Sequence, residues 1–182
     1  MRIIGIDPGT LVTGYGIVDK DGGRISFVAC GCVRNRRGAP LPIRFLNIYR
    51  ELGGVFDDYR PGEMALEGIF FCKNVRTALK LGEARGVAML VAAEKGVEVF
   101  EYAPRRVKQA VLGNGGARKS QVQFMMKSLL GLDEEPSSPD AADALAIALC
   151  RAFAGGGVRS EISDLRSQIK EGARPTRGRV KG

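Results

Sequence analysis

Four carboxylates occupy positions from which they could share one site. Asp7 and Glu67 each end a short apolar run, whereas Asp140 and Asp143 lie three residues apart in an alanine-rich helical pattern. Carboxylates gathered on apolar elements repel one another unless a cation neutralises them. Because hard oxygen ligands select Mg²⁺ or Mn²⁺, the pattern indicates metal-assisted chemistry on a phosphate.

The complete absence of histidine narrows the chemistry further. Without an imidazole, Ser-His-Asp and Cys-His nucleophilic sites are excluded. Each carboxylate also has a structural alternative. Asp140 could stabilise a helix N-terminus, Asp7 could form a turn before Pro8, and Glu67 could pair with an arginine. Asp143 fits such alternatives less well, because a buried carboxylate in so apolar a helix needs a partner. One shared cation site accounts for all four.

Composition favours a polyanionic partner. The 182 residues include 28 Lys and Arg against 20 Asp and Glu, which gives a net charge of +8. Residues 155–182 carry half of this excess and residues 1–154 the other half, so the positive charge is not confined to one end. Such a balance is typical of proteins that bind nucleic acid.

The sequence predicts a cytoplasmic protein without a membrane segment. Met1-Arg2 leads directly into a strand pattern, so we expect no signal peptide, and no apolar run approaches the ~20 residues that span a bilayer. The four cysteines include no CxxC pair. We therefore expect neither a disulfide framework nor a zinc site.

Hydrophobic periodicity predicts an α/β fold with a five-stranded mixed sheet and helices on both faces. The expected strands are 2–7, 13–19, 24–34, 63–67 and 97–102. The expected helices are 41–59, 75–95, 104–112, 119–131 and 138–154. We expect one domain over residues 1–154 and a basic, poorly ordered tail over 155–182. The first strand should be central, which places Asp7 and Glu67 at one rim of the sheet.

Two further segments could contact phosphate or bases. Residues 113–120 approach the phosphate-binding loop pattern, but Arg118 stands where that pattern needs glycine, and a helix rather than a strand precedes it. We interpret the segment as a glycine hinge that brings Arg118 and Lys119 towards phosphate. Phe70 and Phe71 follow Glu67 in a loop, where aromatic rings could wedge between unpaired bases or pack into the core.

These residues together resemble the RuvC family of bacterial Holliday-junction resolvases. The resemblance spans about residues 1–154 and follows the family's order throughout. The matching segments are 5–10, 13–16, 67–74, 78–86, 100–102, 107–109, 119–123 and 140–146.

The resemblance implies an RNase H-like fold, a homodimer, and Mg²⁺-dependent, paired symmetric nicking of four-way DNA junctions in recombination and repair. Branch-migration partners RuvA and RuvB are implied in the same way. We expect two Mg²⁺ per subunit, which Mn²⁺ could replace, and products with 5′-phosphate and 3′-hydroxyl ends. The family's catalytic carboxylates fall on Asp7, Glu67, Asp140 and Asp143.

The resemblance also places DNA contacts. The family's junction-wedging aromatic falls on Phe70, and its DNA-contacting lysines fall on Lys108 and Lys119. Phe71 and Arg118 join them as expected DNA-binding residues because of their positions in the chain. The helix around Gly82 and Gly86 is the expected dimer contact, since small residues permit close approach of a second helix.

Three other functions stay open at this point. The opening strand followed by Asp-x-Gly-Thr also occurs in ATP-binding sugar kinases and actin-like proteins, although these need a second lobe that 182 residues do not provide. A non-catalytic junction-binding protein would need the basic residues but not the four carboxylates. An RNase H-like nuclease for hybrids or flaps would share the acidic site.

Overall fold

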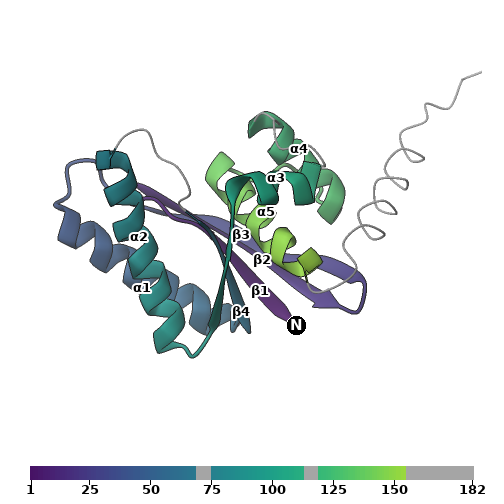
Figure 1. Ribbon diagram of the computed structural model, residues 1–182, viewed down its shortest axis with the longest axis horizontal. Helices are drawn as coiled ribbons and strands as arrows, with labels where there is room; N and C mark the ends of the chain where they lie inside the picture. The colour runs from purple at the N-terminus through teal and green to yellow at the C-terminus, as the bar shows by residue number, and fades with distance from the viewer. Residues whose placement is uncertain (69–74, 113–118, 155–182) are drawn as a thin grey trace, which may run out of the picture.

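The computed structural model describes residues 1–68, 75–112 and 119–154, and their side chains except those of 75–77, 112, 119 and 120. A five-stranded sheet carries helices on both faces, as Figure 1 shows. The strands are β1 (Arg2–Asp7), β2 (Val12–Asp21), β3 (Arg24–Arg34), β4 (Glu63–Glu67) and β5 (Glu98–Tyr102). The helices are α1 (Leu41–Tyr59), α2 (Val75–Glu94), α3 (Pro104–Leu112), α4 (Lys119–Leu130) and α5 (Pro139–Ala154). The predicted element order is confirmed.

The sheet has the order β3-β2-β1-β4-β5, so the first strand is central as predicted. β1 pairs antiparallel with β2 and parallel with β4. Ile6 lies opposite Leu66 in the parallel pair, and each strand ends at the next residue. Asp7 and Glu67 therefore leave neighbouring strands side by side at the same rim.

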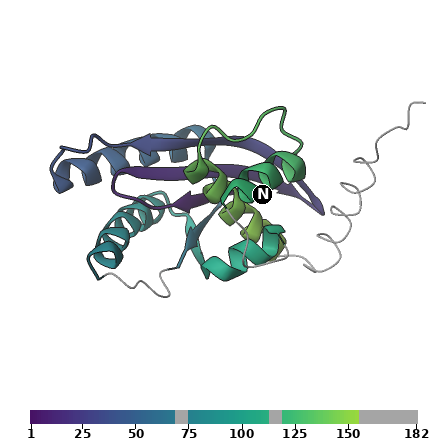
Figure 2. The same ribbon diagram turned by 90° about the horizontal axis from the view of Figure 1, so that it is seen from above.

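Alternating residues of β1 belong to two separate hydrophobic cores, one on each face of the sheet. Ile3 packs with α3, α4 and α5, whereas Ile4 and Ile6 pack with α1 and α2. All three isoleucines are fully buried, as the period of two in a strand requires. Figure 2 shows α1 and α2 separated from α3 and α5 by the sheet. The central strand is thus fixed from both faces, which holds Asp7 at its end in place.

Helix α5 lies directly on β1 and β2 because glycines face it. A Cβ atom at Gly5 would stand 2.1 Å from the Ala144 carbonyl oxygen, and one at Gly14 would stand 2.1 Å from the Asp140 carbonyl oxygen. No side chain fits at either position without moving the helix. The glycines therefore bring the first turns of α5, with Asp140 and Asp143, close to the end of β1.

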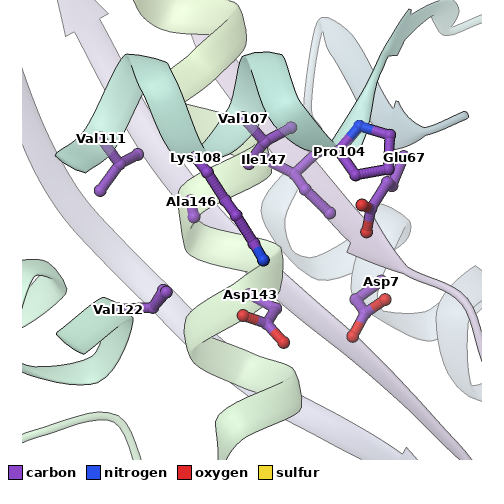
Figure 3. Close-up of a pocket in the computed structure, with 10 residues that line it drawn as sticks. All are labelled: Asp7, Glu67, Pro104, Val107, Lys108, Val111, Val122, Asp143, Ala146 and Ile147. Atoms are coloured by element: carbon purple, nitrogen blue, oxygen red, sulfur yellow. The ribbon is translucent and has the colours of Figure 1, made fainter. Parts of the chain in front are cut away.

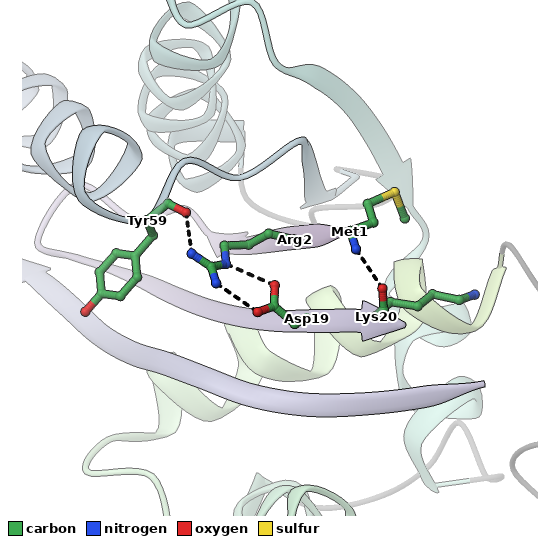
Figure 4. Close-up of polar contacts among 5 residues, drawn as sticks. All are labelled: Met1, Arg2, Asp19, Lys20 and Tyr59. Carbon is green, nitrogen blue, oxygen red and sulfur yellow. Dashed lines mark hydrogen bonds and ion pairs between the residues drawn. The ribbon is translucent and has the colours of Figure 1, made fainter. Parts of the chain in front are cut away.

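Polar contacts hold the opposite end of the first strand (Figure 4). The Arg2 guanidinium donates to both carboxylate oxygens of Asp19, at 2.9 and 2.8 Å, and to the Tyr59 carbonyl oxygen at 2.8 Å. The amino terminus of Met1 donates to the Lys20 carbonyl oxygen at 2.7 Å. These contacts tie β1 to β2 and to the end of α1.

Two sequence predictions, the C-terminal tail and the absence of a membrane segment, involve residues that the structure describes only in part. Residues 155–182, the expected tail, lie outside it, so the division into domain and tail stays a prediction. Within the described ranges, no helix is both long and apolar enough to cross a membrane.

Candidate active site

Three of the four predicted carboxylates line one pocket at the rim where β1 and β4 end. Asp7 comes from β1, Glu67 from β4 and Asp143 from α5, and the pocket has a volume of about 230 Å³. Figure 3 shows the three carboxylates directed into this space. Segments that are far apart in the chain thus converge on one acidic site.

Among the described residues that line the pocket, one lysine accompanies the carboxylates. Lys108, from α3, lines the same pocket, and Figure 3 shows its side chain extending towards the two aspartates. Among the described lining residues, three carboxylates stand against this one ammonium, which offsets part of their negative charge. The sequence interpretation of Lys108 as a phosphate contact is compatible with this place, and its role stays a prediction.

The other described residues that line the pocket are apolar, except for the backbone. These residues belong to α3, α4 and α5. They are Pro104, Val107, Val111, Val122, Ala146 and Ile147. An apolar wall excludes water and lowers the local dielectric constant, so that charges in the pocket interact more strongly than they would in solution. The arrangement favours binding of a cation.

Asp140 does not line this pocket. It lies one turn before Asp143 in the first turn of α5, where a carboxylate is favoured by the helix dipole. Its backbone faces Gly14 on β2. The structure therefore brings three predicted ligands together and places the fourth beside them, and the metal role of Asp140 stays a prediction.

A buried serine that the sequence interpretation missed caps the helix bearing the two aspartates. Ser138 Oγ accepts a hydrogen bond from the Ala141 amide at 3.1 Å and lies 2.9 Å from Cys32 Sγ on β3. Ser138 is only 5% exposed. The serine followed by proline at the first helical position was a signal that could have been recognised, whereas the cysteine contact depends on the fold.

The three pocket carboxylates suit a hard cation that keeps part of its hydration shell better than one that has lost all of its water ligands. Within the described ranges, no three Asp, Glu, Cys or His side chains form a group that could hold an ion by themselves. Mg²⁺ usually binds one or two carboxylates and completes its octahedron with waters and substrate phosphate oxygens. A pocket of about 230 Å³ has room for this shell, since one water takes roughly 30 Å³. Asp7, Glu67 and Asp143 therefore suit Mg²⁺.

The other expected DNA contacts fall largely beyond what can be described. Phe70, Phe71 and Arg118 lie outside the described residues. Lys119 begins α4, and its side chain is not described. These four assignments stay predictions.

The strand order and the helices on both faces define an RNase H-like fold, which solved RuvC structures share. The sequence matches the family described as "Crossover junction endodeoxyribonuclease RuvC" over residues 3–151. The chain belongs to the RuvC family.

Individual relatives agree with this assignment. The RuvC endonuclease of Pelotomaculum thermopropionicum is 53% identical over 152 residues, which cover 84% of this chain and 93% of the relative. That of Brevibacillus brevis is 49% identical, covering 84% and 92%. The structure of T. thermophilus RuvC in complex with a Holliday junction substrate superposes with a TM-score of 0.78 at 37% identity, covering 85% of this chain and 94% of that one.

Proposed function

We propose that this protein is a metal-dependent, structure-selective endonuclease that resolves four-way (Holliday) DNA junctions by paired symmetric nicks during recombination and repair. Membership of the RuvC family supports the activity. The observation that carries the mechanism is the convergence of Asp7, Glu67 and Asp143 on one pocket. Such an acidic site suits divalent ions and would repel a DNA phosphate without them.

Asp7 holds the central place in the proposed mechanism because it ends the central strand. It would contribute to both of two Mg²⁺ sites, with Glu67 completing one and Asp143, together with Asp140, completing the other. When bound by these carboxylates, Mg²⁺, for which Mn²⁺ could substitute, would supply Lewis-acid activation of the attacking water and neutralisation of charge at the leaving 3′ oxygen. The products would carry 5′-phosphate and 3′-hydroxyl ends.

The remaining residues orient the DNA. Lys108 donates to a phosphate oxygen from the edge of the pocket, and the apolar wall keeps bulk water from the reacting phosphate. Phe70 and Phe71 would separate bases at the junction centre, and Arg118 and Lys119 would hold flanking phosphates. The junctions would form in the cytoplasm, where the branch-migration proteins RuvA and RuvB would act as partners of this protein.

A homodimer suits a substrate that has near two-fold symmetry, because an isologous pair presents two equivalent sites. Helix α2 supports this proposal. Leu79 and Leu90 are 61% and 59% exposed, and helical geometry places them on one face with Gly86. A Cβ atom added at Gly86 would meet open space. This face would lie against the same face of the second subunit.

Substrate comparison tests the proposal directly. Equal concentrations of labelled four-way junction, flap, linear duplex and RNA–DNA hybrid are incubated with the protein in Mg²⁺ and in EDTA. We expect paired cuts in the junction alone, only with Mg²⁺, and nicks that DNA ligase reseals because their ends are 5′-phosphate and 3′-hydroxyl. Preferential cutting of the hybrid or flap would contradict the junction assignment.

A further inference from the structure

Three exposed arginines lie together where the edge strand β3 leads into α1. Arg34 ends β3, and Arg36 and Arg37 follow in the turn, which we call the arginine turn (residues 34–37). In the described part of the chain, none of the three guanidinium groups forms an ion pair with an acidic side chain. Their charge is therefore available to a partner.

Hydrogen bonds from the backbone of the arginine turn and from the Asn35 side chain attach the turn to neighbouring segments. The Asn35 amide donates to the Leu11 carbonyl oxygen at 2.8 Å, and Asn35 Nδ2 donates to the Thr10 carbonyl oxygen at 3.1 Å. The Arg44 guanidinium, from α1, donates to the Arg37 carbonyl oxygen. Because the backbone is already ordered, a ligand that binds here meets a lower entropic cost.

The turn is anchored to the loop that follows Asp7. Asp7 pairs with Gly14 on β2, and Gly14 pairs with Cys32 on β3, two residues before Arg34. Two strand spacings across the sheet and two residues along it separate Asp7 from Arg34, or roughly 12 Å between their Cα atoms. Figure 1 shows the turn from β3 to α1 at the same end of the sheet as the end of β1.

We propose that the arginine turn binds the phosphate backbone of a junction arm while a strand of that arm occupies the acidic pocket. The inference rests on the proposed function, because the substrate must be DNA. A B-DNA major groove is about 12 Å wide, so a duplex with one backbone at the pocket places the other backbone within reach of the turn. Arginine suits this role, since its planar fork of donors matches phosphate oxygens.

The turn lies on the opposite side of the pocket from α3, which carries Lys108. Helix α3 packs on the α5 face of the sheet, whereas the turn leads into α1 on the other face. Contacts from both sides would fix the direction in which the arm crosses the rim. The arginine turn thus extends the DNA footprint over β1 and β2 to the edge strand.

Matched charge-removing variants test this inference. Arg36→Gln with Arg37→Gln removes two charges from the turn. Arg24→Gln with Arg50→Gln removes two exposed charges elsewhere, and Arg24 begins the same strand β3 at its far end. Junction binding is measured in EDTA by fluorescence anisotropy across a salt series, and junction cleavage in Mg²⁺ is measured in parallel with the wild type. Circular dichroism melting confirms that all variants fold.

We expect the turn variant to lower the slope of log K against log salt by about two, because two arginines no longer neutralise a phosphate each. We also expect it to bind the junction about tenfold more weakly than the control variant in 0.1 M salt. Equal losses in the two double variants would overturn the inference while leaving the proposed function intact if the wild type still cuts junctions. A wild-type protein that neither binds nor cuts junctions would overturn both.

Discussion

Strand β4 begins and ends with a glutamate, and the two glutamates have different surroundings. Glu63, at the start, accepts hydrogen bonds at 2.8 Å from both Nε and Nη2 of Arg151. The Arg151 guanidinium also stacks on the Phe100 ring, 3.5 Å from its centroid. Glu67, at the end of the same strand, lines a pocket with two aspartates and a lysine. The same residue type serves the fold at one end and suits chemistry at the other.

Strands β1 and β2 show the same difference between carboxylates at the two ends of the sheet. Asp19 accepts two hydrogen bonds from Arg2, and Asp7, at the other end, lines the pocket. A carboxylate that accepts two hydrogen bonds from one arginine is neutralised and held in a fixed geometry. It therefore has little affinity left for a metal cation. In the described lining of the pocket, three carboxylates stand against one lysine. The surroundings therefore distinguish the arginine-paired carboxylates from those that we propose to be catalytic.

The largest expected effect is on catalysis at the pocket end. Asp7→Asn should lower the rate of junction cleavage by about 1,000-fold or more, because both proposed ion sites lose a ligand, while junction binding changes little. Single-turnover cleavage and anisotropy binding on the same preparation measure the two quantities. Cleavage at the wild-type rate would exclude Asp7 from the catalytic set.

The next effect is on stability at the other end. Glu63→Gln should lower the free energy of unfolding by about 2–3 kcal/mol, because it leaves the largely buried Arg151 charge without its partner. Urea unfolding measures this change. Cleavage per folded molecule should match the wild type, and a selective loss of cleavage would show that the two ends are not functionally distinct.

Lys108→Gln sharpens the comparison inside the pocket. Cleavage should fall by about 10-fold, because the variant can no longer donate a charge-assisted hydrogen bond to phosphate. Mn²⁺ affinity without DNA, measured by electron paramagnetic resonance, should rise, since removal of the ammonium increases the negative potential. Weaker Mn²⁺ binding would instead indicate that Lys108 holds the carboxylates in position.

The smallest effect concerns acid stability of the Arg2–Asp19 pair. Hydrogen bonds from Arg2 lower the pKa of Asp19, so the pair stabilises the folded state above about pH 4, the ordinary carboxyl range. That contribution disappears as the pH falls through the lowered pKa. Asp19→Asn should therefore be less stable than the wild type at pH 6, and the difference should shrink as the pH falls below about 4. A constant difference in melting temperature across this range would contradict the role assigned to the charge.

Much of the fold followed from the sequence because its signals are local. Short apolar runs and helical periodicity located every element to within about two residues. The expected central position of the first strand put Asp7 beside Glu67 on the strength of the sequence alone. Chain connectivity and strand pairing rules were sufficient for this part of the site.

The remaining features depended on tertiary packing. Asp140 and Asp143 are about 60° apart around their helix axis, and only the contact of α5 with the strand glycines determines that Asp143 enters the pocket. The Cys32 contact to Ser138 joins residues more than 100 positions apart. The arginine turn resembles any solvated basic loop in sequence, and only its bonds to Thr10 and Leu11 reveal its place beside the pocket.

The most direct test of the account is a crystal structure of the protein bound to a four-way junction in Mn²⁺, with anomalous difference maps collected at the manganese edge. We expect anomalous peaks in the pocket between Asp7, Glu67 and Asp143, next to a junction phosphate, and none at Glu63 or Asp19. Manganese bound away from these three carboxylates, with the phosphate still seated at the pocket, would contradict it.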